Sequence, residues 1–245
     1  MKSLFAYLTA FEKLLWCGSA GLIIVMFCIF DRQNFLTLAA SLTGVTSLIF
    51  CAKGNPVGQL LIIIFSGMYG VISYRFAYYG EMITYLGMTA PMAAVSLVSW
   101  LKNPYDGNKA EVKVNSISRR ETGFMLLLTA AVTVLFYYIL KYFGTANLVP
   151  STFSVATSFA AAYLTFRRTA YFSAAYALND LVLIIMWILA AMTDISYLSV
   201  TVCFVVFFVN DLYGFVSWRK MKLRQSETNS ANCTNKVGQQ GDFIP

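Results

Sequence analysis

Two matching polar motifs occur in the last two apolar stretches of the chain. Each is an Asn-Asp pair with a tryptophan seven positions after the Asp, which is close to two turns of an α-helix. The Asp and the Trp of each motif therefore share a helix face. Amides and carboxylates on such a face can bind hydroxyl groups, and aromatic rings can stack on a planar ring. The motifs are Asn179-Asp180 with Trp187, and Asn210-Asp211 with Trp218.

The two motifs are expected at the same depth in a membrane. Asn179 lies about ten residues after the start of its stretch and Asn210 about eight before the end of the next, antiparallel one, so both lie roughly 12–15 Å deep. A charged or strongly polar side chain there costs about 2.5–3.5 kcal/mol. One alternative is that these side chains only join helix to helix. Their repetition favours a lined cavity, and an aspartate beside aromatic faces would suit a cationic ligand.

Other side chains are candidates for the same cavity. Tyr176 lies four positions before the first Asp and joins its helix face. Tyr69 and Tyr213 are further aromatic candidates for contact with a planar ring. Gln59 is expected near the cytoplasmic mouth, where solvation at the membrane interface explains it as well as substrate contact does. Pro91 interrupts the fourth apolar stretch, where it frees a carbonyl group and can kink the helix.

The composition indicates an all-α integral membrane protein. Of 245 residues, 58% are hydrophobic and 12% are charged, whereas a soluble domain carries about 25% charged residues. The sequence has no histidine, its five cysteines show no C-x-x-C spacing, and it contains no G-x-x-x-x-G-K-[ST] loop. These features argue against His-based catalysis, a Cys-His metal site and a built-in ATPase. We therefore expect neither an enzyme nor a bound cofactor.

Eight apolar stretches are long enough to cross a lipid bilayer, which takes roughly 20 residues each. They are residues 11–30, 33–52, 57–79, 82–101, 121–143, 149–166, 170–192 and 196–218. With eight spans, 15 of the 18 Lys and Arg residues fall on one side, and Arg32, Arg75 and Lys141 fall opposite. The positive-inside rule then places both termini in the cytoplasm. Basic residues placed in this way orient a membrane protein, so they do not indicate nucleic-acid binding.

The ends of two spans indicate an internal repeat. Segments 98–102 (VSWLK) and 216–220 (VSWRK) lie 118 residues apart. Spans two to four thus resemble spans six to eight in the same orientation, as in transporters that hold substrate between two halves. The predicted organisation is an N-terminal helix (1–32), a first three-helix bundle (33–101), a cytoplasmic connection (102–120), a linker helix (121–145), a second three-helix bundle (146–218) and a disordered cytoplasmic tail (219–245).

Roughly residues 10 to 224 resemble the PnuC family of nicotinamide riboside transporters. The matching stretches are 51–59 (CAKGNPVGQ), 78–82 (YYGEM), 91–92 (PM), 176–187 and 210–218. The resemblance implies a SWEET-like fold, in which two three-helix bundles are joined by a linker helix, and a homotrimer in the bacterial inner membrane. By position, the resemblance implies that the substrate cavity is lined by Asn179, Asp180, Trp187, Asn210, Asp211 and Tyr213.

The function implied by this resemblance is import of nicotinamide riboside, a vitamin B3 precursor for NAD biosynthesis. The family implies facilitated diffusion with alternating access, followed by trapping through a cytoplasmic riboside kinase. Relatives of the same fold resemble carriers of thiamine, riboflavin or deoxynucleosides, so another vitamin or nucleoside is the alternative cargo. Transport coupled to protons through Asp180 and Asp211 is a further alternative, because carboxyl groups inside a membrane often relay protons. A membrane enzyme would need convergent catalytic groups that the sequence lacks, and a receptor would use the 102–120 connection to dock a partner.

Overall fold

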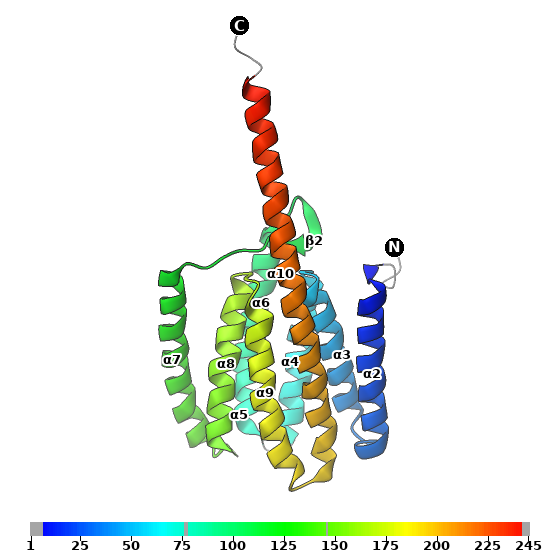
Figure 1. Ribbon diagram of the computed structural model, residues 1–245. Coiled ribbons are helices and arrows are strands. Elements are labelled where there is room, and N and C mark those ends of the chain that lie inside the picture. The colour runs from blue at the N-terminus through cyan, green and yellow to red at the C-terminus, as the bar shows by residue number, and fades with distance from the viewer. Residues whose placement is uncertain (1–6, 76–77, 146, 242–245) are drawn as a thin grey trace.

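The computed structural model describes residues 7–75, 78–145 and 147–241, and long helices make up most of it (Figure 1). The helices are α2 (Ala10–Phe30), α3 (Phe35–Ala52), α4 (Val57–Arg75), α5 (Tyr79–Thr84), α6 (Ala90–Lys102), α7 (Arg119–Tyr142), α8 (Leu148–Phe166), α9 (Phe172–Ala191) and α10 (Leu198–Gly241). A π-helical turn, η1 (Tyr85–Thr89), joins α5 to α6, and a 3-10 turn, η2 (Ile195–Tyr197), precedes α10.

The predicted all-α membrane fold is confirmed, with α5, η1 and α6 together forming the fourth span. In the described part of the chain, seven spans are long and apolar enough to cross a membrane. The remaining long helix, α8, is more polar, but its Ser151, Ser154, Ser158 and Thr165 are buried against other helices. Hydroxyl groups enclosed in this way can hydrogen-bond across helices instead of facing lipid. The protein is therefore a multi-pass helical membrane protein.

Six helical segments form a closed ring in which each packs against the next. In order around the ring they are α3, α4, α6, α8, α9 and α10, and α10 packs against α3 again. Outside the ring, α7 packs on α8, and α2 packs on both α3 and α10. Figure 1 shows α2 and α7 at opposite edges of the bundle. The ring places side chains from both halves of the sequence around one interior.

The fourth span is widened rather than simply kinked. Pro91 occupies the first turn of α6 and has no N–H group, so a regular helical bond to the carbonyl of Gly87 is missing. Directly before it, the N–H of Ala90 bonds to the carbonyl of Tyr85 five residues back, which defines the π turn η1. Such turns are frequent at functional sites. Here the wide turn carries Tyr85 and Thr89 toward the interior of the ring.

A short β-ribbon lies in the connection between the two halves. Strand β1 (Pro104–Tyr105) pairs antiparallel with β2 (Asn108–Val112), and Gly107 adopts a positive φ at the turn between them. The ribbon and the residues directly after it bind the far part of α10, and Gln225 makes several of these bonds. Gln225 Nε2 donates to the carbonyl of Val112 at 3.1 Å, and Gln225 Oε1 accepts from the N–H of Val114 at 2.8 Å.

Helix α10 does not end at Trp218, as the sequence analysis expected. It continues to Gly241 as one long helix that leaves the bundle (Figure 1). Its continuation is fixed on the ribbon by Gln225, which is 4% exposed, and by an ion pair between Arg224 and Glu111. The predicted disordered tail is therefore wrong for the segment that binds the ribbon, because a polar composition does not reveal partners elsewhere in the chain.

Candidate substrate cavity

A small cavity of about 60 Å³ lies inside the ring. A mostly apolar wall with a few polar groups is typical of small-molecule sites. The wall consists of Gly44, Ser47 and Leu48 of α3, Ile62 and Phe65 of α4, Tyr85 and Thr89 of η1, Ser158 of α8, Tyr176, Asn179 and Asp180 of α9, and Phe204, Phe207 and Asp211 of α10. The structure thus brings together four of the predicted site residues: Tyr176, Asn179, Asp180 and Asp211.

The side-chain amide of Asn179 is held in one orientation. Its Oδ1 accepts hydrogen bonds from Thr157 Oγ1 at 2.8 Å and Ser158 Oγ at 2.9 Å, both on α8. Because hydroxyl groups occupy the oxygen, the amide NH₂ group remains as a donor for a guest molecule. Asn179 is 3% exposed, so this donor is removed from bulk water. A hydroxyl or carbonyl oxygen of a guest is its natural partner.

Two carboxyl groups meet where α9 packs on α10. The side chains of Asp180 and Asp211 are in hydrogen-bonding contact, and Ser173 also bonds to Asp211. A hydrogen bond between two carboxyl groups requires a proton on one of them. Among the described residues, Asp180 Oδ2 has no hydrogen-bond partner. An unpaired buried oxygen beside a cavity favours a ligand that offers a hydroxyl group or a positive charge.

Aromatic rings line the same cavity as these polar groups. The centroids of Phe65 and Phe207 are 5.6 Å apart, and those of Phe65 and Tyr85 are 5.9 Å apart, both edge to face. The backbone of α3 comes very close to this cluster, because a Cβ atom at Gly44 would overlap Phe207 Cζ. The absence of a side chain at Gly44 therefore lets the Phe207 ring pack against α3.

Gly44→Ala is expected to weaken cargo binding about tenfold. The added methyl group would push the Phe207 ring into the cavity, and overpacking of this kind costs about 1–3 kcal/mol. Equilibrium binding to purified protein measures the effect. Gly67→Ala in α4 is the matched control, because a Cβ atom there meets nothing within 4 Å. Equal affinities for the two variants would contradict the close contact at Gly44.

Two predicted cavity residues of α10 do not line the cavity. Neighbouring side chains on a helix point about 100° apart, so α10 turns Asp211 inward and its neighbours elsewhere. Asn210 Nδ2 donates to Ser19 Oγ of α2 at 3.0 Å. Tyr213 Oη donates to Glu12 Oε1 of α2 at 2.9 Å. Both therefore join α10 to the outer helix α2, which the sequence alone does not place beside α10.

Three further predicted residues surround the cavity without lining it. Trp187 is fully buried, and its Nε1 donates to Tyr69 Oη at 2.8 Å. Gln59 is 1% exposed, and its Nε2 donates to Cys51 Sγ at 3.3 Å. Solvation at the membrane interface therefore does not explain Gln59, and its contact with α3 is a packing contact between neighbouring helices.

The two tryptophans of the repeated motif mark opposite ends of the ring. Seven residues at 1.5 Å each place each tryptophan roughly 10 Å from the aspartate of its motif. Because α9 and α10 run antiparallel, Trp218 lies toward the end from which α10 continues, and Trp187 lies toward the other end (Figure 1). We call the end near Trp218, which carries the β-ribbon and the start of α2, the basic end. The opposite end, near Trp187, is the far end.

A reciprocal set of hydrogen bonds closes the basic end. Two Ser-Trp pairs at the ends of spans four and eight, Ser99-Trp100 and Ser217-Trp218, make these bonds. Each pair bonds to the last carbonyls of a helix in the other half of the chain, and we call this set of bonds the clasp. The bonds are Trp100 Nε1 to Thr165 O (2.9 Å), Ser99 Oγ to Phe166 O (3.0 Å), Trp218 Nε1 to Cys51 O (2.7 Å) and Ser217 Oγ to Ala52 O (2.8 Å). The two indole rings are 5.4 Å apart and fully buried.

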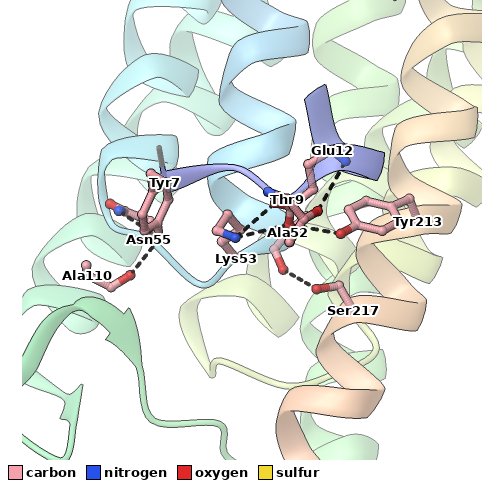
Figure 2. Close-up of polar contacts among 9 residues, drawn as sticks. All are labelled: Tyr7, Thr9, Glu12, Ala52, Lys53, Asn55, Ala110, Tyr213 and Ser217. Atoms are coloured by element: carbon pink, nitrogen blue, oxygen red, sulfur yellow. Dashed lines mark hydrogen bonds and ion pairs between the residues drawn. The ribbon is translucent and has the colours of Figure 1, made fainter. Parts of the chain in front are cut away.

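The start of α2 crosses the same end and joins the two halves (Figure 2). Glu12 is 3% exposed, and its carboxylate accepts hydrogen bonds from Lys53 Nζ at 3.0 and 3.1 Å and from Tyr213 Oη at 2.9 Å. A capping box with Thr9 orients this carboxylate. Since Lys53 follows α3 and Tyr213 belongs to α10, one side chain connects both helices beside the clasp.

Tyr7 extends this contact to the ribbon (Figure 2). Its hydroxyl donates to the carbonyl of Ala110 and accepts from Asn55 Nδ2, both at 3.2 Å. Burial raises the pKa of Tyr7 above its ordinary value, so the hydroxyl stays a neutral donor. We call residues 7–12 the N-terminal strap. The sequence analysis did not predict the strap, because a glutamate such as Glu12 is common at the edge of an apolar stretch.

Glu12→Gln is expected to destabilise the protein by about 2 kcal/mol, because Lys53 and Tyr213 lose a charged acceptor. Thermal unfolding in detergent measures the loss. Glu121→Gln is the control, because Glu121 pairs with Arg167 where both side chains are more exposed, at 22% and 35%, and such pairs contribute about 0–1 kcal/mol. A larger loss for Glu121→Gln would contradict the role given to the strap.

Much of the cavity wall from the first half was also missed. Gly44, Ser47, Thr89 and Tyr85 line it, but small and hydroxyl-bearing residues are common in membrane helices that pack closely. A polar face of α3, formed by Gly44 and Ser47 one turn apart, was the available signal. It is weak because the same spacing also serves helix packing.

A ring of membrane helices around a small polar and aromatic cavity is an arrangement expected of a transporter of small molecules. The model of the family described as nicotinamide mononucleotide transporter matches residues 34–220. The chain belongs to this family, which confirms the expected class of transporter rather than enzyme.

Individual relatives agree with this assignment. A curated protein of Neisseria mucosa named nicotinamide riboside transporter PnuC is 27% identical over 231 residues, which cover 92% of this chain and 87% of the relative. A solved structure described as the crystal structure of the vitamin B3 transporter PnuC is similar with a TM-score of 0.78 and 25% identity. The similarity covers 89% of this chain and 94% of that chain. The predicted resemblance to PnuC is therefore confirmed.

Proposed function

We propose that the protein carries nicotinamide riboside across the membrane by facilitated diffusion. The observation that supports this most is a cavity lined by the oriented amide of Asn179, the carboxyl groups of Asp180 and Asp211, and aromatic rings. Nicotinamide riboside offers the matching groups, namely ribose hydroxyls and a flat pyridinium ring with a permanent positive charge. A carboxylate near aromatic faces favours such a cation.

The lining of the cavity argues against a phosphorylated cargo. A nucleoside monophosphate would bring its negative charge close to Asp180 and Asp211, where like charges repel. No lysine or arginine is among the residues that line the cavity in the described chain. The unphosphorylated riboside therefore fits better than the mononucleotide in the family description. Thiamine, riboflavin and deoxynucleosides are the competing cargoes.

Alternating access would open the two ends of the ring in turn. Opening the basic end requires release of the clasp and rearrangement of the strap, and opening the far end requires separation of Trp187 from Tyr69. The reciprocal bonds of the clasp support the predicted repeat of two three-helix bundles around a linker helix, α7. This movement needs no ATP, because the cargo moves down its gradient.

Orientation and partners follow from the same proposal. The basic end carries most lysines and arginines, so it faces the cytoplasm of a bacterial inner membrane, with both termini inside. Facilitated diffusion of the cationic riboside stops at equilibrium, so net accumulation requires trapping inside, which a cytoplasmic riboside kinase would provide. A homotrimer is expected from the family resemblance.

Uptake into proteoliposomes at zero membrane potential tests the proposal. We expect saturable uptake of labelled nicotinamide riboside that stops at equal concentrations inside and outside, with or without a pH gradient. Unlabelled riboside should compete, and the mononucleotide should not. Accumulation above equilibrium driven by a pH gradient would instead support proton coupling through Asp180 and Asp211. Absence of riboside uptake, with uptake of thiamine or riboflavin, would contradict the proposed cargo.

A further inference from the structure

Glu81 is a buried carboxyl group outside the central cavity. It lies in the first turn of α5 and is fully buried, and neither of its oxygens has a partner with good hydrogen-bond geometry among the described residues, although the hydroxyl of Ser154 lies nearby. It takes part in none of the ion pairs found in that part of the chain. An acid in a first helical turn is favoured by the helix dipole. That benefit does not require burial, however, and an unpaired carboxylate inside a membrane is costly.

The surroundings of Glu81 are aromatic. It lies close enough to the hydroxyl groups of Tyr69, Tyr78 and Tyr85 to act on them electrostatically. The ring centroids of Tyr69 and Tyr85 are 4.3 Å apart, and those of Tyr78 and Trp187 are 4.9 Å apart. Aromatic faces attract organic cations through their π electrons, and a carboxylate adds a full negative charge. At these distances the rings pack on one another, so a flat cation would reach Glu81 and these rings when the far end opens.

Glu81 is connected to the central cavity by polar side chains. Ser154 of α8 lies beside Glu81, and Ser154 Oγ is 3.5 Å from Asn179 Oδ1. Tyr85 both neighbours Glu81 and lines the cavity. Since α5 begins at the far end (Figure 1), Glu81 lies between that end and the groups that bind the cargo.

We propose that Glu81, with the rings of Tyr69, Tyr78 and Tyr85, is a second binding station for the cargo on the far side of the central cavity. The station binds the positively charged ring and so selects cationic over neutral nucleosides. This proposal rests on the proposed function, because it concerns the path of the same cargo. It adds a specificity-determining residue to the cavity side chains Asn179 and Asp180.

A pair of cargoes that differ in charge tests this station. Nicotinamide riboside is a cation, whereas its reduced dihydro form is neutral and nearly the same size. In proteoliposomes at zero membrane potential, E81Q is expected to lower the ratio of maximal rate to KM about tenfold for the cation and less than threefold for the neutral form. Retained uptake of the neutral form also shows that E81Q is folded.

Two further variants complete the experiment. E121Q changes a glutamate in the first turn of α7, away from the cavity lining, and is expected to leave both cargoes within twofold of wild type. E81D retains the charge and should retain the preference for the cation. Equal losses of both cargoes in E81Q, or no loss, would overturn the proposal, as would failure of both Glu81 variants to assemble. Lack of riboside uptake by the wild type would instead contradict the proposed function.

Discussion

Asn179→Leu is expected to weaken binding of nicotinamide riboside by about 10- to 100-fold. The change removes the amide donor and leaves the hydroxyl group of Ser158 without its acceptor, whereas Thr157 can still donate to the carbonyl of Phe153. A lost hydrogen bond together with unsatisfied buried groups costs about 1–3 kcal/mol. Leucine has the same branching and the same number of side-chain heavy atoms as asparagine, so it approximates the shape of the side chain, although its methyl groups are larger. Isothermal titration of purified protein with the riboside measures the change in Kd.

Asn210→Leu is the matched control for this prediction. It makes the same substitution in the repeated motif, but Asn210 bonds to Ser19 of α2 outside the cavity. Its Kd should stay within about threefold of wild type, with at most a small loss of thermal stability. A large loss of affinity in Asn210→Leu, with none in Asn179→Leu, would show that the cargo lies on the other face of α10.

Trp218→Ala is expected to lower the free energy of unfolding by about 3–5 kcal/mol. The change leaves a large gap in a fully buried cluster with Trp100 and Phe172, and large-to-small substitutions of tryptophan have this cost. It also removes the bond to the carbonyl of Cys51. Thermal unfolding in detergent or nanodiscs should show the loss, and Trp100→Ala should match it because the clasp is reciprocal.

Trp218→Phe separates packing from hydrogen bonding at this position. Phenylalanine keeps an aromatic ring but cannot donate to Cys51 O, so we expect a smaller loss of about 1–2 kcal/mol. Because the clasp closes the basic end, this variant should also release cargo faster in single-turnover efflux. Unchanged stability in Trp218→Ala would contradict the clasp as a major contact between the halves.

The sequence was sufficient to predict the membrane helices because the signal is local. A run of roughly 20 apolar residues identifies a span without knowledge of its neighbours, and the predicted bounds of α7, at 121–143, differ from Arg119–Tyr142 by two residues or fewer. The ribbon and the long α10 were not predicted. They depend on Gln225 bonding to Val112 and Val114, a contact between segments 111 residues or more apart.

The candidate site was predicted only in part, because some of its features are local in the sequence and others depend on packing. Asp180 and Asp211 are costly in a membrane, so their presence alone indicated an interior role, and both line the cavity. Trp187 and Tyr213 share their stretches but point to Tyr69 and Glu12, because helix rotation is set by packing and not by composition. Glu81 lies between the predicted spans 57–79 and 82–101. It was therefore not a predicted site residue, since a charge near the end of a stretch normally faces water.

We expect the cargo to bind among Asn179, Asp180 and Asp211 inside the ring. A cryo-EM or crystal structure of the protein with nicotinamide riboside in lipid nanodiscs would show where the cargo lies. We predict density for the riboside in this cavity, with ribose hydroxyls at the two aspartates and the pyridinium ring against Phe207 or Tyr176. Density for the riboside at another site, with Asn179 and the two aspartates bonded only to protein, would show that this cavity does not bind the cargo.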